Sequence, residues 1–97
     1  SADPIPDVIP TEFSITSTYP NPFNATLSIQ YDIPQAAQIS LSVYDLLGRE
    51  VATLFQGMKD PGRHAVFWNA EGVSTGVYFI RLHSEHRSAT QKVLLLK

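Results

Sequence analysis

Apolar and polar side chains alternate with a period of two along much of the chain, a pattern typical of β-strands that bury one face. The clearest case is the segment 27–33, whose apolar positions all fall on one side. They are Leu27, Ile29, Tyr31 and Ile33. The residues between them are polar, and Pro34 follows directly, so the pattern predicts a half-buried strand that ends at residue 33.

Six further strands are predicted, separated by turns rich in Gly, Pro, Asn and Asp. Their ranges are 13–16, 39–44, 50–55, 64–68, 76–83 and 88–96. The segment 50–55 alternates less clearly than the others, and no segment of useful length has the period of a helix. About seven short strands with frequent turns predict an all-β fold, an immunoglobulin-like antiparallel sandwich without the disulfide of antibody domains.

Composition supports one folded domain. The chain has 97 residues, of which 43% are apolar, and it contains no cysteine, so neither a disulfide nor a thiolate metal site holds the fold. Prolines at positions 4, 6 and 10 predict a semi-rigid interdomain linker over residues 1–12, followed by the domain over 13–97. No signal peptide or long apolar run is present, so if the chain is exported its signal lies elsewhere, and we expect a fragment of a longer precursor.

Charge argues against a nucleic-acid partner, because the formal net charge is only −2. The charges are unevenly distributed, since residues 1–48 carry no Lys or Arg whereas residues 49–97 carry all seven. Two interpretations stay open. Either the charges of a small sheet protein are simply scattered, or the basic second half contacts a surface or an anionic polymer.

Candidate chemistry is sparse. The best titratable cluster is His83, Glu85 and His86, but no further histidine or thiolate accompanies it, so we predict no metal site. No nucleophile motif or phosphate-binding loop appears, and we expect neither catalysis nor a cofactor.

Aromatic side chains leave a carbohydrate site open. Trp68 with Phe67, or Tyr44 with Tyr31, could form a platform for sugar rings. Trp68, however, alternates in register with His64 and Val66, which favours a place in the core.

The last strand departs from simple alternation, because Val93, Leu94, Leu95 and Leu96 are apolar on both sides. Leu94 and Leu96 face opposite to Val93 and Leu95, beside Val77 and Phe79 of the neighbouring strand. We hypothesise an exposed apolar strip that a partner grips, by pairing with the strand edge or by burying the leucines, and that favours weak self-association. The alternative is a final strand covered by the N-terminal segment.

Five motifs occur in a characteristic order, and the last lies at the C-terminus. They are YPNPFN at 19–24, VYDLLGREV at 43–51, PGRHAVFWN at 61–69, GVYFIRL at 76–82 and KVLLLK at 92–97. Together they closely resemble the C-terminal type A sorting domain of the type IX secretion system, over about residues 16–97. One departure is Ala25, since many members have Pro at this position.

The resemblance implies a non-catalytic module of a secreted multidomain protein from the Bacteroidota or a related lineage, with a glycoside hydrolase among the possible cargoes. Implied partners are the outer-membrane secretion machinery, a sortase-like protease and anionic lipopolysaccharide, on a route from the periplasm to the cell surface. The alternative is a carbohydrate-binding or cell-attachment module. The residues assigned to partner recognition are Pro20, Asn21, Pro22, Phe23, Gly48, Arg49, Gly76, Tyr78, Lys92, Val93, Leu94, Leu95, Leu96 and Lys97.

Some of these residues also have an expected role in the conformation of the backbone. Pro20 and Pro22 are expected to make the path into the strand at 27 rigid and so to set the angle between the sandwich and the linker. Gly48 is predicted to take a left-handed conformation that leaves Arg49 exposed to an anionic partner. Gly76 is expected to allow a sharp turn before Tyr78.

Overall fold

The structure is a computed structural model that describes residues 9–97, and these residues form seven β-strands. The strands are β1 (Ser14–Tyr19), β2 (Thr26–Ile33), β3 (Ala37–Tyr44), β4 (Glu50–Lys59), β5 (Gly62–Asn69), β6 (Gly76–His83) and β7 (Ser88–Leu95). Within this part of the chain, no helix has the length and hydropathy needed to span a membrane. Most of the predicted linker over 1–12 lies outside the described residues.

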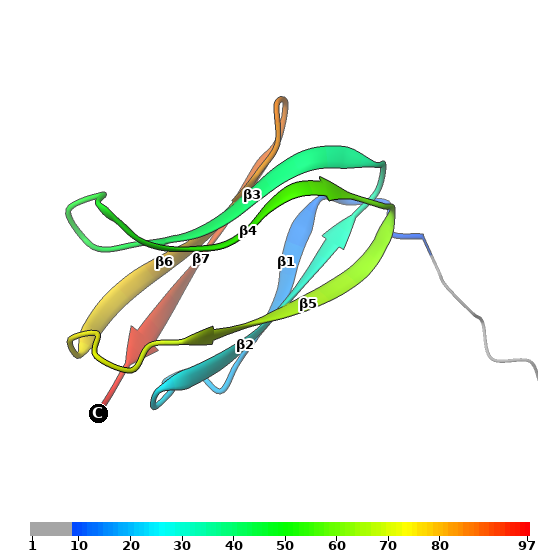
Figure 1. Ribbon diagram of the computed structural model, residues 1–97. Helices are drawn as coiled ribbons and strands as arrows, with labels where there is room; N and C mark the ends of the chain where they lie inside the picture. Colours follow the sequence, from blue (N-terminus) through cyan, green and yellow to red (C-terminus); the bar gives the residue numbers. More distant parts are fainter. Residues whose placement is uncertain (1–8) are drawn as a thin grey trace, which may run out of the picture.

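The strands build two antiparallel sheets that pack face to face (Figure 1). The smaller sheet has the order β1-β2-β5, and the larger has the order β4-β3-β6-β7. This arrangement confirms the predicted immunoglobulin-like sandwich, in which the β2–β3, β4–β5 and β5–β6 connections cross between the sheets and alternate side chains fill the space between them.

Two strands extend by several residues past their predicted C-terminal ends. β4 continues to Lys59 instead of ending at 55, and β1 continues to Tyr19 instead of ending at 16. The reason is visible in their registers, because both strands contain irregularities typical of β-bulges, which break the alternation. In β4, for example, Leu41 pairs with Phe55 and Ser42 with Thr53, so Leu54 has no direct partner.

The core lies between the sheets and contains the apolar positions that the alternation predicted. All four inward residues of β2 are at most 1% exposed, and the equivalent residues of the larger sheet are equally buried. The latter are Ile39, Leu41, Val43, Ile80, Leu82, Val93 and Leu95. Burying each such side chain contributes about 1.5–3 kcal/mol of hydrophobic free energy before the entropy of ordering is subtracted.

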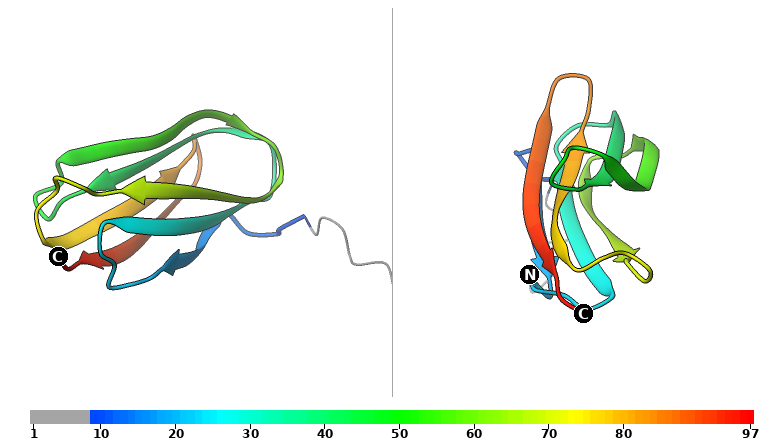
Figure 2. Two further views of the ribbon diagram at one scale, coloured as in Figure 1. Left: turned by 60° about the horizontal axis from the view of Figure 1, so that its bottom comes forward. Right: turned by 90° about the vertical axis from the view of Figure 1, so that its left-hand side faces the viewer.

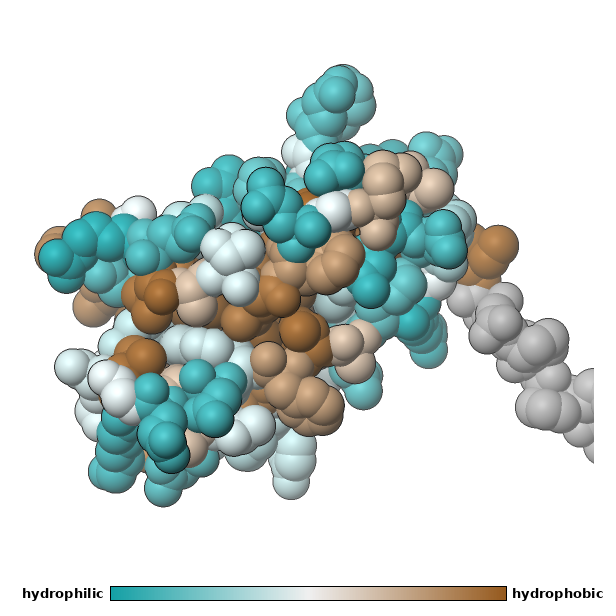
Figure 3. Space-filling view, viewed as in Figure 1, coloured by the Kyte–Doolittle hydropathy of each residue, from teal (hydrophilic) through white to brown (hydrophobic). Residues whose placement is uncertain are grey.

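The two long sides of the sandwich differ. Figure 3 shows apolar surface between the edge strands β4 and β5, where partly buried Leu54, Phe55 and Val66 pack against the core. The Lys59 ammonium lies 4.4 Å from the centre of the Phe55 ring and covers part of this surface. The opposite side, between β1 and β7, is closed by a loop and contains most of the predicted site.

All the predicted site residues lie at or near one end of the sandwich. We call this end the C-terminal end, and define it by the loops 20–25, 45–49 and 70–75 together with residues 96–97. Figures 1 and 2 show these segments at the end that carries the C-terminus, away from the point where the N-terminal segment joins β1. Site residues from four motifs that are far apart in the sequence therefore lie close to one another through the antiparallel topology.

Candidate partner-recognition site

Residues 21–23 run alongside the end of β7 and close the edge of the larger sheet. The side-chain amide of Asn21 acts like a peptide group, because its Oδ1 accepts a hydrogen bond from the Leu94 N–H (3.0 Å) and its Nδ2 donates to the Lys92 carbonyl (3.3 Å). Phe23 continues the ladder with its backbone, donating to the Leu94 carbonyl (2.9 Å) and accepting from the Leu96 N–H (3.0 Å). We call residues 21–23 the clamp.

The clamp corrects two expectations. The edge of β7 over residues 92–96 is not free to pair with a partner strand, since Asn21 and Phe23 already use its outward N–H and carbonyl groups at Lys92, Leu94 and Leu96. The segment that covers the edge is the β1–β2 loop instead of the N-terminal segment. Pro20 and Pro22 lie in the connection from β1 to β2, so all of β1 separates them from residue 12.

An aromatic cluster anchors the clamp from inside. Phe23 is 1% exposed, and its ring centre lies 5.4 Å from that of Trp68, which in turn lies 5.6 Å from Tyr78 in an edge-on arrangement. The Tyr78 hydroxyl donates to the Ser74 carbonyl, so its one polar group is satisfied although the ring is buried. Phe23 and Tyr78 therefore support the site from the core and do not present their side chains to a partner.

Trp68 and Tyr31 are not available to stack on a sugar. Trp68 is 3% exposed and Tyr31 is 1% exposed, so neither of the two platforms considered from the sequence forms. The alternation of Trp68 with His64 and Val66 predicted this outcome correctly, because all three residues face the other sheet.

Two further hydrogen bonds join the loop 70–75 to residues next to the clamp and to the C-terminus. The Ala70 N–H donates to the Ala25 carbonyl, and the Lys97 N–H donates to Oγ1 of Thr75 (3.2 Å). Ala25 has a φ of 74°, which is incompatible with proline, so this loop differs locally from that of relatives with Pro at this position. The sharp turn before β6 is made by Gly72, with a φ of 87°, and not by Gly76, which is already paired with Leu95.

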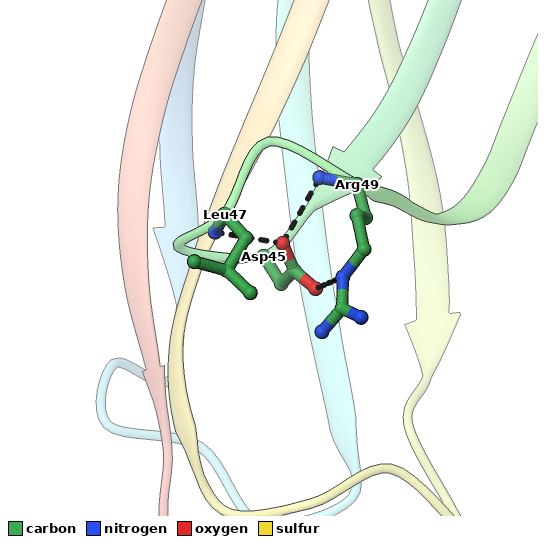
Figure 4. Close-up of polar contacts among 3 residues, drawn as sticks. All are labelled: Asp45, Leu47 and Arg49. Atoms are coloured by element: carbon green, nitrogen blue, oxygen red, sulfur yellow. Dashed lines mark hydrogen bonds and ion pairs between the residues drawn. The ribbon is translucent and has the colours of Figure 1, made fainter.

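The β3–β4 turn is held by the carboxylate of Asp45 (Figure 4). Oδ1 accepts hydrogen bonds from the N–H groups of Leu47 (2.8 Å) and Arg49 (3.0 Å), and Oδ2 accepts one from Nε of Arg49 (2.9 Å). Gly48 has a φ of 82°, as predicted for a left-handed position. The Arg49 side chain is 73% exposed but forms an ion pair with Asp45, so an anionic partner would bind the guanidinium group in competition with Asp45 or beside it.

The Asp45 interactions predict a pH dependence. The pKa of Asp45 is lowered, first by the backbone N–H of Arg49 and further by the Arg49 side chain and the Leu47 N–H, although desolvation acts in the opposite direction. A carboxyl group whose pKa is lower in the folded state stabilises the fold at every pH above its unfolded-state pKa. This contribution to stability is lost as the pH falls through the folded-state pKa. Asp45→Asn should therefore lower stability in urea unfolding at neutral pH, with a difference from the native chain that shrinks in acid.

Asp60→Asn is the matched control, since Asp60 is an exposed acid in the turn between β4 and β5. A difference between Asp45→Asn and the native chain that stays constant from neutral pH to strongly acidic pH would contradict the stabilising role of the Asp45 carboxylate.

The outer face of the larger sheet keeps part of the predicted apolar strip. Leu94 lies directly across from Val77, and both are half-buried, as is Phe79 across from exposed Lys92. Leu96 is 47% exposed and is followed by exposed Lys97. Val93 and Leu95 face the core, so only the alternate positions of the last strand are open to a partner.

Sequence reasoning missed two exposed leucines at the same end. Leu46 is 68% exposed and Leu47 is 77% exposed, at the tip of the turn that Asp45 holds. The sequence does contain a signal for them, because two apolar residues in a turn between predicted strands cannot reach the core and are expected to be exposed.

The titratable cluster near the β6–β7 turn is open to solvent. His86 and Glu85 are each 84% exposed at their side chains, with 3.3 Å between Nε2 and Oε1. Among residues 9–97, no group of three or more His, Cys, Asp or Glu side chains is arranged to hold a metal ion.

Fold and site together define an immunoglobulin-like module whose distinctive feature is a clamped C-terminal strand. The family model described as "Secretion system C-terminal sorting domain" matches residues 17–96, so the chain belongs to this family and the resemblance to type IX sorting domains is confirmed. No curated protein matches the chain significantly.

A solved structure has a similar fold. It comes from a study of PorZ, described as an essential bacterial surface component of the type-IX secretion system of Porphyromonas gingivalis. The match has a TM-score of 0.56 and 22% sequence identity, and it covers 86% of this chain but only 11% of that chain. This chain therefore spans about a tenth of the length of the similar protein, and the likeness concerns the fold alone.

Proposed function

We propose that this domain directs a secreted multidomain protein from the periplasm through the type IX secretion machinery to the cell surface, and that the machinery recognises the C-terminal end of the sandwich. The observation that carries the proposal is the clamp. It joins the YPNPFN and KVLLLK segments into one surface that exists only in the folded domain, so recognition would report that the domain has folded.

The residues divide into two groups in this proposal. Exposed or half-exposed residues contact the partner, and they are Pro20, Asn21, Pro22, Arg49, Lys92, Leu94, Leu96 and Lys97. The buried residues, the turn glycine and the first residue of β6 hold these contacts in place, and they are Phe23, Gly48, Gly76, Tyr78, Val93 and Leu95. The leucines supply apolar contacts, while the cations supply complementarity to an acidic protein surface or to anionic lipopolysaccharide.

Several finer points belong to the same proposal. A sortase-like protease acts on the segment that joins cargo and domain, where residues 1–12 form the linker and 13–97 the sorting domain. Glycoside hydrolases are among the cargo classes that the resemblance implies. The domain itself takes no part in catalysis, and the half-exposed strip of Val77, Phe79, Leu94 and Leu96 favours weak self-association.

The test is a fusion of residues 13–97 behind a periplasmic reporter, in a host that has this secretion system. We expect the reporter to appear outside the cell. The double variant Leu94→Ser/Leu96→Ser should leave most of the reporter in the periplasm, because it removes the apolar contacts while changing only partly exposed side chains. The fraction of reporter activity in medium and at the cell surface is the measurement.

Met58→Ser is the matched control, since Met58 is 63% exposed on the edge strand β4, outside the C-terminal end. Reporter that stays in the periplasm with the native domain would contradict the sorting function. Reporter exported equally well by the double leucine variant would contradict the assigned surface alone.

A further inference from the structure

The outer face of the smaller sheet carries two exposed aromatic side chains in one row. Tyr19 of β1 and Phe67 of β5 both pair with Ser28 of the central strand β2, so the three residues point to the same side of the sheet. Tyr19 is 72% exposed and Phe67 is 69% exposed. Since each lies one strand from Ser28, their backbones are separated by about 10 Å.

The positions directly around this row are uncharged, and all but Ala65 are polar. On the same face, Thr26 pairs with Asn69 on one side of the row, and Gln30 pairs with Ser17 and Ala65 on the other. A small polar residue separates the two rings, so the face is not the contiguous apolar patch that protein partners usually cover. It offers instead flat rings spaced along a line, with amides and hydroxyls between and beside them.

A hollow continues the face beyond Gln30. Its volume is about 410 Å³, and it is lined by Thr16, Gln30, Asp32, Arg63, His64 and Ala65. Ala65 and Thr16 are small, which leaves the space open, and Gln30 lies about 7 Å along the strand from Ser28.

Asp32 gives a second and independent observation that indicates a ligand site. The residue is only 7% exposed, and its Oδ1 has no hydrogen-bond partner. The nearest cation is Nε of Arg63 at 3.6 Å, which is beyond hydrogen-bond distance. A buried carboxylate oxygen without a donor is unusual. The Arg63 side chain that covers it is 74% exposed, so a ligand that brings a hydroxyl group can displace it.

We propose that the outer face of the β1-β2-β5 sheet binds a neutral polysaccharide chain. Pyranose rings have an apolar face that stacks on an aromatic ring and hydroxyl groups at their edges that need donors and acceptors. Tyr19 and Phe67 provide the stacking surfaces, and Gln30, Asp32 and Arg63 bind the hydroxyls of a neighbouring sugar in the hollow. Asp32 accepts the hydroxyl hydrogen bond that its Oδ1 lacks in the free domain.

This site meets the surface assigned to sorting at one point, where Tyr19 precedes Pro20 in the chain, and otherwise lies on a different face. The sorting surface includes the clamp, the end of β7 and the outer face of the larger sheet, whereas the sugar site lies on the outer face of the smaller sheet. Two different partners could therefore be bound by one small domain.

The experiment uses the 97-residue chain and isothermal titration calorimetry with cellohexaose, xylohexaose and mannohexaose, followed by affinity electrophoresis on the corresponding soluble polymers. We expect at least one hexaose to bind with a dissociation constant of about 1 mM or lower, a weak affinity for a contact of this size. Tyr19→Ala and Phe67→Ala should each weaken binding about fivefold, which corresponds to one aromatic stacking contact. The double variant should show no measurable binding.

Asp32→Asn tests the hollow separately, since it keeps the shape of the side chain and removes its charge. Weaker binding of the same hexaose, with an unchanged circular dichroism spectrum, supports the role of Asp32. Met58→Ala is the control for a general loss of exposed apolar surface and should bind like the native chain.

Three results would overturn the proposal. The first is that no hexaose or neutral polymer binds, or that only anionic polysaccharides do. The second is binding that the Tyr19→Ala/Phe67→Ala double variant retains in full. The third is a dimer in sedimentation equilibrium that this double variant abolishes, because the aromatic row would then be occupied by a second copy of the chain.

Discussion

Phe23→Ala is expected to lower the free energy of unfolding by about 3–5 kcal/mol, the usual loss for a buried phenylalanine. Phe23 is 1% exposed and its ring packs against Trp68, so the smaller side chain leaves a cavity under the clamp. Because small domains have about 5–15 kcal/mol of stability, this one change removes a large part of it. Urea unfolding followed by the fluorescence of Trp68 measures the effect.

Phe67→Ala is the matched control, since it is the same substitution at a side chain that is 69% exposed. Its stability should stay within about 0.5 kcal/mol of the native chain. If the two variants lost similar stability, Phe23 would not be the internal anchor of the clamp, and the YPNPFN segment would have to be regarded as an ordinary surface loop.

Strands with simple alternation could be predicted from the sequence almost to the residue. β2 and β6 are examples, because their buried positions fall at every second residue and nothing interrupts their ladders. β4 could not be predicted to its full length, since register irregularities leave Val51 and Leu54 without direct partners and destroy the period. The burial of Trp68 followed from its register alone.

The site was predicted in part. Its motifs could be named from the resemblance, but no local signal indicates that the Asn21 side chain binds the backbone of Lys92 and Leu94, which lie 71 and 73 residues further along the chain. Such a contact depends on the order of strands in both sheets. The exposed edge hypothesised for β7 was wrong for the same reason, because the strand that looked free in the sequence is covered by a loop far away in it.

Deletion of residues 92–97 is expected to unfold the domain as well as to remove its sorting surface. The deletion takes Val93 and Leu95 out of the core, where both are at most 1% exposed, and it removes every hydrogen-bond partner that Asn21 and Phe23 have on β7 and Leu96. The two side chains alone contribute about 3–6 kcal/mol of burial, a large share of the stability of a small domain. Circular dichroism should show that the cooperative unfolding transition is lost.

A secretion defect in the deletion variant therefore cannot by itself identify residues 92–97 as the part that a partner contacts. Leu94→Ser/Leu96→Ser separates the two roles, since Leu94 is half-buried on the outer face and Leu96 is 47% exposed. We expect this variant to unfold cooperatively at a urea midpoint near that of the native chain while losing most reporter export. A deletion variant that keeps the native midpoint would refute the structural role of β7, and its normal export would refute the recognition role as well.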